Sequence, residues 1–300
     1  MDRDKRIDKL IGEELVTFEL FDEKNELLIE YYARENIKIV DNNNHSNQCI
    51  IFFSSNGIYF PNDTETFLNR IQLENRYEWS NVTRKSSRIK KYGKIIYVRD
   101  IYKQWYVKGV SKEINSIDKL IEYLREQTIG FEVTTVGNSA GGYIATLIGL
   151  KLDVKRVFNF SGQYNLNDIV DSQYYLNKER KSNMHYYNLV PLLIEKSVDV
   201  FYFYPAYSKN DMEQAELVEG VEAVYSFAID SDDHGLTVLP MCYQYMFTMN
   251  NSKMAKLYKK TKNKIINRKL FLIQTAGIYH ALVDYTIFKL GKSVFNKANL

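Results

Sequence analysis

Residues 131–150 read FEVTTVGNSAGGYIATLIGL, and this stretch decides the fold. Its first six residues form a largely apolar run typical of a buried strand. Its last eleven residues have little polar surface, as in a helix that is buried on all sides. Between them lies the turn Gly137-Asn-Ser-Ala-Gly-Gly142, which matches the pattern G-x-S-x-G. A serine at a sharp strand-to-helix turn between small residues predicts a nucleophilic hydroxyl held above a sheet; a purely structural glycine-rich turn is the alternative.

Strands and helices alternate around this stretch. An apolar stripe at helical spacing predicts a helix around residues 114–124, and a second, short helix is predicted at residues 211–218. Repeated β–α units of this kind predict an α/β fold, with a mostly parallel sheet and helices on both faces. Short apolar runs predict the other strands at residues 49–53, 94–98, 154–160, 198–204 and 223–229.

Two regions depart from this regular alternation. Residues 16–20 alternate in polarity and residues 27–32 are apolar and aromatic, so both are predicted as strands. They give a β-rich N-terminal extension over residues 1–45. A stretch rich in Tyr and Asn, residues 163–190, is predicted to be a cap-like insertion.

A basic helical appendage, residues 251–300, is predicted to follow a catalytic domain of residues 1–250. The appendage has eleven Lys and Arg against one acid, so its net charge is +10 and that of the preceding residues is −7. This asymmetry predicts contact with a polyanion, namely anionic lipid, acidic polysaccharide or nucleic acid; a solvated helix face is the alternative. Four lysines recur at helical spacing: Lys253, Lys256, Lys260 and Lys264.

The apolar part of the appendage is interrupted by polar residues. Residues 270–288 contain Gln274, His280 and Asp284, which argues against a helix that spans a membrane. Two interpretations remain. The segment is either a helix docked on the core or an amphipathic helix lying in a membrane interface beside the lysines.

The composition limits the class of protein. Of 300 residues, 45% are apolar and 26% charged, as in a globular protein and not in a disordered chain. The two cysteines, Cys49 and Cys242, are too few for a disulfide framework or a four-cysteine zinc site. No apolar segment follows the charged residues 1–6, so we expect no secretory signal and a cytoplasmic location.

Ser139 is the predicted nucleophile, and a serine needs a base to be activated. The chain has four histidines. His234 follows the last predicted strand, at the sheet edge where α/β proteins present catalytic side chains, so we predict it as the base. His45 lies in an Asn-rich loop, His280 lies in an apolar run, and His185 is the reserve candidate.

The acid that orients the base is predicted from the order of the chain. Asp211 follows the strand that precedes the one leading to His234, which gives the order Ser, Asp, His. Asp230, Asp232 and Asp233 compete for this role, but an acid so close in sequence rarely reaches the far ring nitrogen. A helix-capping role is the alternative for Asp211.

This ordered set of Ser139, Asp211 and His234 resembles the α/β-hydrolase superfamily of serine esterases and acyltransferases, over residues 45–250. Three short stretches are also similar to bacterial enzymes of capsule and cell-surface polysaccharide loci. Some of those enzymes are serine-dependent polysaccharide O-acetyltransferases that use acetyl-CoA. The stretches are GNSAGGY (137–143), NFSGQY (159–164) and FYPAYS (203–208).

The resemblance also implies how an oxyanion would be stabilised. The backbone N–H of Ala140 follows the serine at a helix N-terminus and is the first predicted donor. The loop after the strand at residues 49–53 would supply the second. In this chain the loop begins Ser-Ser in place of the usual His-Gly pair, which leaves Asn56 or Gly57; the predicted donor is Asn56.

The implied activity is transfer of an acetyl group from acetyl-CoA, through an acyl-enzyme on Ser139, to a hydroxyl of a capsular or cell-surface polysaccharide. No metal, no tightly bound cofactor and no nucleic-acid partner is expected. The basic tail would contact an anionic polysaccharide, the membrane or a biosynthetic complex. The protein would then lie in the cytoplasm, peripheral to the inner membrane face.

Two other functions are consistent with the same residues. A carboxylesterase or polysaccharide deacetylase would use the same machinery with water as the acceptor. A non-catalytic scaffold in a membrane-associated assembly would use the fold alone. Five tyrosines near the predicted site are candidates for stacking on sugars or, alternatively, for packing on the sheet: Tyr164, Tyr174, Tyr175, Tyr186 and Tyr187.

Overall fold

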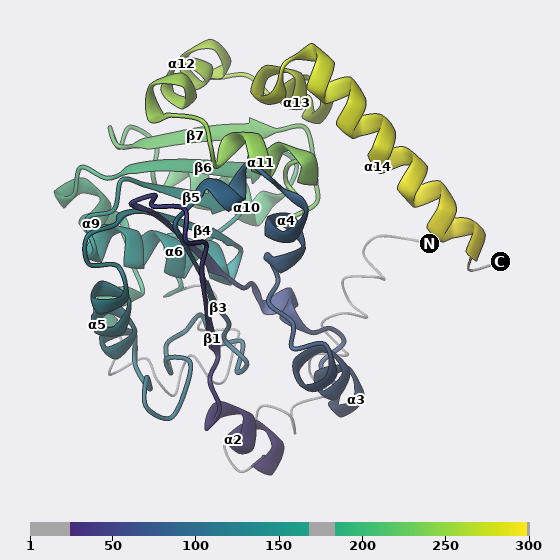
Figure 1. The fold of residues 1–300 in the computed structure, drawn as a ribbon. Helices are drawn as coiled ribbons and strands as arrows, with labels where there is room; N and C mark the ends of the chain where they lie inside the picture. Colours follow the sequence, from purple (N-terminus) through teal and green to yellow (C-terminus); the bar gives the residue numbers. More distant parts are fainter. Residues whose placement is uncertain (1–24, 168–183, 299–300) are drawn as a thin grey trace.

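A computed structural model describes residues 25–167 and 184–298 (Figure 1). Its strands form one sheet in the order β1-β3-β2-β4-β5-β6-β7, in which β1 is antiparallel to β3 and all other neighbours are parallel. The predicted α/β fold with a mostly parallel sheet is confirmed. The strands are β1 (Ile37–Asp41), β2 (Gln48–Phe53), β3 (Lys94–Val98), β4 (Glu132–Asn138), β5 (Arg156–Phe160), β6 (Asp199–Pro205) and β7 (Val224–Ile229).

Helices cover both faces of the sheet (Figure 1). One face carries α5 (Ile117–Gln127), α6 (Ala140–Lys151), α9 (Val190–Glu195) and α10 (Lys209–Glu216). The other carries α4 (Ser80–Lys85), α11 (Tyr243–Met246), α12 (Asn251–Thr261) and α13 (Arg268–Ala276). The remaining helical segments are α2 (Glu26–Tyr32), η2 (Asn56–Ile58), α3 (Thr64–Phe67), η3 (Leu68–Leu73), η4 (Ile89–Lys91), η5 (Met184–Tyr186), η6 (Pro240–Cys242) and α14 (Ile278–Ala298).

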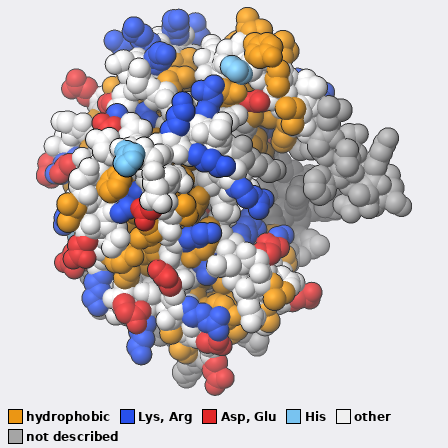
Figure 2. Space-filling view, viewed as in Figure 1, with side chains coloured by type: hydrophobic (Ala, Val, Ile, Leu, Met, Phe, Trp, Pro, Cys, Tyr) orange, Lys and Arg blue, Asp and Glu red, His pale blue; other side chains and the backbone are white. Residues whose placement is uncertain are grey.

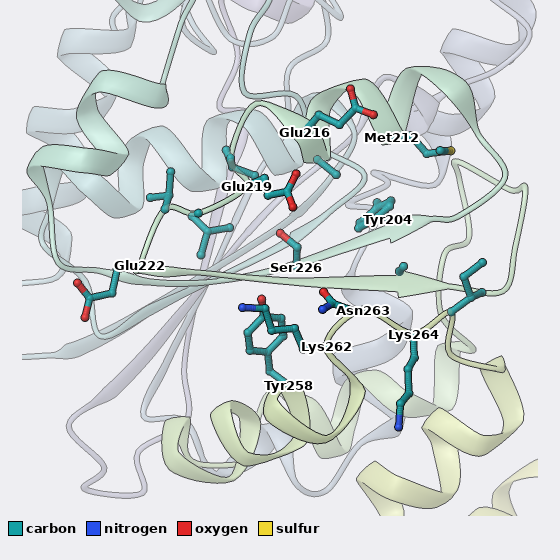
Figure 3. Close-up of a pocket in the computed structure, with 17 residues that line it drawn as sticks. Tyr204, Met212, Glu216, Glu219, Glu222, Ser226, Tyr258, Lys262, Asn263 and Lys264 are labelled. Carbon is teal, nitrogen blue, oxygen red and sulfur yellow. The ribbon is translucent and has the colours of Figure 1, made fainter.

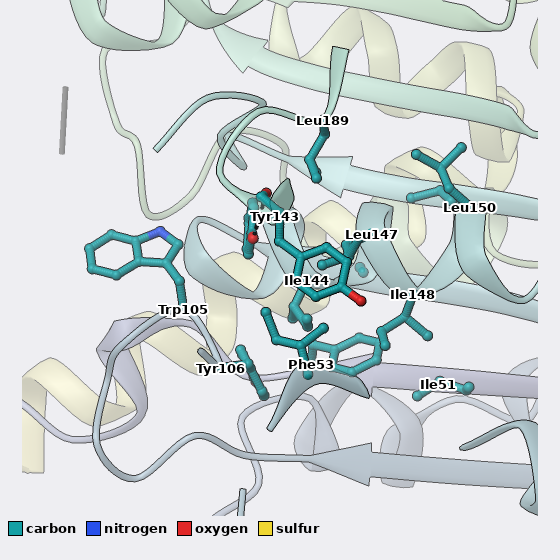
Figure 4. Packing of buried hydrophobic residues seen from close by; sticks show 14 of the residues in the cluster. Ile51, Phe53, Trp105, Tyr106, Tyr143, Ile144, Leu147, Ile148, Leu150 and Leu189 are labelled. Carbon is teal, nitrogen blue, oxygen red and sulfur yellow. Dashed lines mark hydrogen bonds between the residues drawn. The ribbon is translucent and has the colours of Figure 1, made fainter. Parts of the chain in front are cut away.

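The predicted buried helix is α6, and eleven of its twelve residues are buried. Its aliphatic side chains pack among Ile51 and Phe53 of β2 and Val157 of β5 (Figure 4). Because this helix starts directly after β4, its position fixes where Ser139 lies relative to the sheet.

The opposite face of the sheet is lined by aromatic side chains. Phe203 stacks on Phe227 with ring centroids 4.8 Å apart, and Phe271 of α13 packs edge-on against both rings. Ile266 adds a parallel bridge to Ile229 at the end of β7. Much of the C-terminal region therefore belongs to this hydrophobic core. The helix predicted to carry the four regularly spaced lysines is shorter than expected, because α12 ends before Lys264.

The N-terminal region differs from its prediction. The segment predicted as a strand at residues 27–32 is the helix α2, whose first amides are capped by the Asn25 side chain. Leu28 and Tyr31 face inward and pack near Phe67 of α3. An N-cap residue followed by apolar side chains at three-residue spacing explains the helix. The other predicted strand, residues 16–20, lies outside the described residues.

Two further helix predictions need correction. The helix predicted around residues 114–124 begins after Ser116, which caps it, so Ile114 precedes it. The apolar segment predicted at residues 270–288 breaks at Gly277 into α13 and α14. No helix in the described part of the chain has both the length and the apolar character that crossing a membrane requires.

Candidate active site

Ser139 lies at the sharp turn between β4 and α6. Its backbone angles are φ 53° and ψ −122°, which residues other than glycine rarely adopt. A Cβ atom on Gly137 would lie 1.9 Å from the carbonyl oxygen of Gly141, and one on Gly141 would lie 2.5 Å from that of Phe53. Both glycines are thus required by the close approach of the backbone. The turn has the strained strand–turn–helix geometry of a nucleophile elbow.

The structure brings Ser139, Asp211 and His234 together at the carboxyl edge of the sheet. Ser139 lies in the turn before α6, Asp211 in the first turn of α10, and His234 in the loop after β7. The Nε2 atom of His234 lies 2.8 Å from the Oγ atom of Ser139. Its Nδ1 atom lies 2.9 Å from each carboxylate oxygen of Asp211. The three groups therefore form one continuous chain of hydrogen bonds, with the imidazole in the middle.

The environments of Asp211 and His234 suit different roles. The Asp211 side chain is 3% exposed, whereas the His234 side chain is 41% exposed. A buried carboxylate against Nδ1 favours the tautomer that carries its hydrogen there, which leaves Nε2 free to accept the serine proton. The arrangement can activate the hydroxyl of Ser139.

The competing side chains lie elsewhere. His45, His185 and His280 are exposed, and no hydrogen bond joins any of them to Ser139. Asp233 accepts the backbone N–H groups of Gly235 and Leu236 at 2.9 and 3.0 Å. Asp230 accepts a hydrogen bond from Asn267. Asp211 reaches the imidazole, with both carboxylate oxygens 2.9 Å from Nδ1.

The loop after β2 distinguishes between the two candidates for the second oxyanion donor. The N–H of Gly57 donates to the Oγ atom of Ser55 at 3.0 Å, so it is already used. The N–H groups of Asn56 and Ala140 make no hydrogen bond within the described residues. Both lie at the start of a helical segment, where backbone amides have no intrahelical partner. This observation favours Asn56 over Gly57.

Glu78 holds this loop and was not found by sequence reasoning. Its carboxylate accepts hydrogen bonds from the backbone N–H and from the hydroxyl of Ser55, the latter at 2.8 Å. Burial raises the pKa of Glu78, and the two hydrogen bonds from Ser55 oppose that shift. Glu78 therefore fixes the residue that precedes Asn56. No motif marks Glu78, because its partner lies 23 residues away.

A second buried carboxylate organises the loop after β3. Asp100 accepts the backbone N–H groups of four residues in the loop: Tyr102, Lys103, Gln104 and Tyr106. Burial raises the pKa of Asp100 against these hydrogen bonds. The hydroxyl of Tyr106 then donates to the carbonyl oxygen of Ser54 at 2.8 Å. The loop thus supports the chain segment that leads to Asn56.

The tyrosines considered for sugar stacking are differently placed. Tyr164, Tyr186 and Tyr187 are buried in the core around α6 and α9, so their rings are not available to a sugar. The hydroxyl of Tyr143 donates to the carbonyl oxygen of Tyr186 at 2.9 Å, within the same core. Tyr174 and Tyr175 lie outside the described residues.

A separate hollow of about 560 Å³ runs along the free edge of β7, between α10 and α12 (Figure 3). Acidic side chains, including Glu216 and Glu219, line one wall, and Lys262 and Lys264 lie on the other. None of the three residues of the hydrogen-bonded chain lines this hollow. It is distinct from the site around Ser139.

Among known proteins, the chain is similar to solved structures only. No protein-family model matches the chain, and no curated protein matches it. Three of the similar solved structures are a capsule O-acetyltransferase of Neisseria meningitidis serogroup A, MenH from Staphylococcus aureus, and an α/β hydrolase from a lagoon-sediment metagenome. Another structure of the first protein, a variant of it, contains CoA.

The similarity is weak in each case. The capsule O-acetyltransferase is 11% identical, with a TM-score of 0.49, over 75% of this chain and 92% of that one. MenH is 13% identical, with a TM-score of 0.44, over 75% and 100%. The metagenomic hydrolase is 14% identical, with a TM-score of 0.41, over 76% and 96%. These similarities assign neither a substrate nor a reaction to this chain.

Proposed function

We propose that the protein catalyses serine-dependent acyl transfer through an acyl-enzyme on Ser139. The observation that carries this proposal is the chain of hydrogen bonds from Ser139 through His234 to the buried Asp211. A serine in a strained turn, an imidazole 2.8 Å from its Oγ atom and a carboxylate on the far ring nitrogen are the parts that such chemistry needs.

In the first half-reaction, Ser139 Oγ attacks the carbonyl carbon of the acyl donor while its proton moves to Nε2 of His234. The tetrahedral intermediate then breaks the bond to the leaving group, which takes the proton from Nε2. An ester on Ser139 remains. Throughout this step Asp211 accepts the Nδ1–H hydrogen bond and stabilises the transient imidazolium.

In the second half-reaction, an acceptor hydroxyl gives its proton to Nε2 of His234 and attacks the ester carbonyl carbon. The intermediate collapses, the Ser139 oxygen recovers a proton, and the acyl group leaves on the acceptor. The N–H groups of Ala140 and Asn56 would hold the oxyanion in both halves. Loss of one such donor typically costs about 2.7–4 kcal/mol of transition-state stabilisation.

For the donor and acceptor we propose acetyl-CoA and a hydroxyl of a bacterial capsular or cell-surface polysaccharide. The support for this choice is the resemblance of three stretches that surround the site, residues 137–143, 159–164 and 203–208. Hydrolysis, as in a carboxylesterase or deacetylase, is the second candidate. The two differ in whether water or the sugar reaches the acyl-enzyme first.

Labelling with a fluorophosphonate probe tests the nucleophile. We expect the wild-type chain to be labelled once, Ser139→Ala to lose the label, and the matched control Ser226→Ala to keep it. Thiols should not compete, because burial raises the pKa of both Cys49 and Cys242 to about 12. A folded wild-type protein that never labels at Ser139 would favour the non-catalytic scaffold.

Consumption of acetyl-CoA with and without capsular oligosaccharide separates the two enzymatic candidates. Transferase activity predicts CoA release that depends on the oligosaccharide, together with a mass increase of one acetyl group on the sugar. Release of acetate from simple esters at the same rate with and without oligosaccharide, and no acetylated sugar, would instead establish a hydrolase.

A further inference from the structure

The helices α13 and α14 present a continuous apolar surface to solvent. Ile278, Leu282 and Ile287 are 68%, 64% and 63% exposed. Elsewhere in the described chain, exposed large apolar side chains such as Ile129 and Ile194 belong to separate elements. We define the docking surface as seven exposed side chains: Leu270 and Ile273 on α13, and Ile278, Tyr279, Leu282, Val283 and Ile287 on α14.

The apolar side of α14 faces outward because a polar contact holds its other side inward. Asp284 accepts hydrogen bonds from the Tyr245 hydroxyl at 2.7 Å and from the Gln244 side chain at 3.0 Å. Ala281, one turn earlier on the same side, is buried. At 100° per residue, Ile278, Leu282 and the other exposed apolar side chains of α14 lie on the opposite half of the helix. A surface helix normally shows the reverse arrangement.

Basic residues predominate in the chain segment that carries this surface. From residue 251 to residue 289 the chain has nine Lys and Arg and one acid, Asp284, which is the residue already bound to α11. Lys269 and Lys289 lie beside the surface, each with its ammonium group within 5.6 Å of the centre of the Tyr285 ring. Figure 2 shows hydrophobic side chains gathered at this end of the molecule, with lysines and arginines next to them.

We propose that α13 and α14 dock on the surface of a lipid bilayer that contains anionic lipid. The seven apolar side chains would enter the boundary between head groups and acyl chains, and the lysines would contact the anionic head groups. In this arrangement the contact is peripheral, with both helices in the plane of the interface. The inference is independent of the proposed function, since it uses no residue near Ser139.

Charge distinguishes this partner from two others. A second copy of the chain would place the same lysines against one another, and like charges across an interface are unfavourable. A soluble acidic polysaccharide would satisfy the lysines but would leave the seven apolar side chains in water. An anionic bilayer matches both the charge and the apolar character of the docking surface.

Sedimentation of the full-length protein with lipid vesicles tests the proposal. We expect binding to vesicles of phosphatidylcholine mixed with phosphatidylglycerol, roughly tenfold or more above binding to phosphatidylcholine alone. Added salt should weaken the binding, because it screens the lysines. No binding to the mixed vesicles at low salt would overturn the proposal.

A matched pair of substitutions locates the contact. Leu282→Asp should lower binding to the mixed vesicles by roughly tenfold or more, because a charge enters the apolar surface. Ile129→Asp, at a site that is 75% exposed on the loop after α5, should leave it unchanged. Binding that survives Leu282→Asp would mean that charge alone is responsible. Self-association that Leu282→Asp abolishes, without vesicle binding, would identify a second copy as the partner.

A fluorescence measurement keeps the test valid if a charged substitution disturbs folding. Both natural tryptophans, Trp79 and Trp105, are buried, so Tyr279→Trp adds the one exposed reporter. Its emission should shift to the blue and be quenched by brominated lipid when mixed vesicles are added. Ile129→Trp, the control, should show neither effect. Equal responses from the two variants would refute docking through α14.

Discussion

The helices α6 and α14 are both rich in apolar residues, but they lie in opposite surroundings. Of the twelve residues of α6, eleven are buried; in α14, Ala281 is the one buried residue at positions 278–289. The first helix packs on β2, β4 and β5, and the second packs on α13 at the edge of the molecule (Figure 1). An apolar composition alone therefore does not show whether a helix is buried in the core or exposed at the surface.

The largest expected difference between the two helices is the effect of a substitution on kcat. Ser139→Ala, at the start of α6, should lower kcat for hydrolysis of p-nitrophenyl acetate by roughly 10⁴- to 10⁶-fold, because the nucleophile is lost. Leu282→Ala, on α14, should change kcat by less than about twofold. Far-UV circular dichroism serves as the control for folding. Substantial activity in a folded Ser139→Ala variant would break the comparison.

The next difference should appear in stability. Leu147→Ala removes a fully buried side chain from α6 and should lower the free energy of unfolding by about 2–5 kcal/mol. Leu282→Ala makes the same chemical change on an exposed side chain and should stay within about 0.5 kcal/mol. Urea unfolding of both variants and the wild type measures these values. Equal losses of unfolding free energy in the two variants would mean that Leu282 is buried in solution.

A smaller effect is expected from the carboxylate that supports the loop packed against α6. Glu78→Gln should lower kcat by roughly tenfold, since an amide oxygen can replace only part of the contact with Ser55. Burial raises the pKa of Glu78 above 4.5, so the folded state binds this proton more tightly than the unfolded state does. Stability from this group is present below pH 4.5 and is lost as pH rises through the raised pKa.

Urea unfolding from pH 4.5 upward tests the direction of this change of stability with pH. The wild type should lose stability relative to Glu78→Gln as the pH rises, and the difference between the two chains isolates Glu78 from other titrating groups. Parallel curves for the two chains would show that the carboxyl is not perturbed by burial. An unchanged kcat would show that the position of the loop after β2 does not depend on Glu78.

The smallest effect should come from the carboxylate that holds α14. Asp284→Asn weakens a charge-assisted contact with Tyr245 and should reduce local stability by about 1 kcal/mol. Hydrogen exchange should then accelerate in α14 and remain unchanged in α6. Thr286→Ala, an exposed change on the same helix, is the control. Exchange that does not change in Asp284→Asn would show that α14 is held by other contacts.

The sequence predicted the parts of the fold that local pattern determines. The strand, turn and helix around Ser139 follow from residues that are neighbours in the chain. The meeting of Asp211 and His234 follows from the rule that the carboxyl ends of parallel strands share one edge. Whether these residues catalyse acyl transfer stays a prediction that the labelling experiment tests.

The parts that were missing depend on distant contacts, whereas α2, which was predicted wrongly, has a local signal. The helix α2 replaces a predicted strand, although its N-cap residue Asn25 could have indicated it. Glu78 and Asp100 became visible only when folding placed them beside backbone amides of loops. The outward face of α14 depends on the contact between Asp284 and Tyr245, which are 39 residues apart. No local pattern contains such information.

The bridge between Ile229 and Ile266 has a practical consequence for how the protein can be shortened. Removing everything after residue 250 would take away Phe271 and would uncover the stacked rings of Phe203 and Phe227. We therefore expect a chain shortened at residue 250 to aggregate, because these apolar rings would be exposed to water. Trimming that stops after α13 keeps those rings covered, and it would yield a chain that lacks α14.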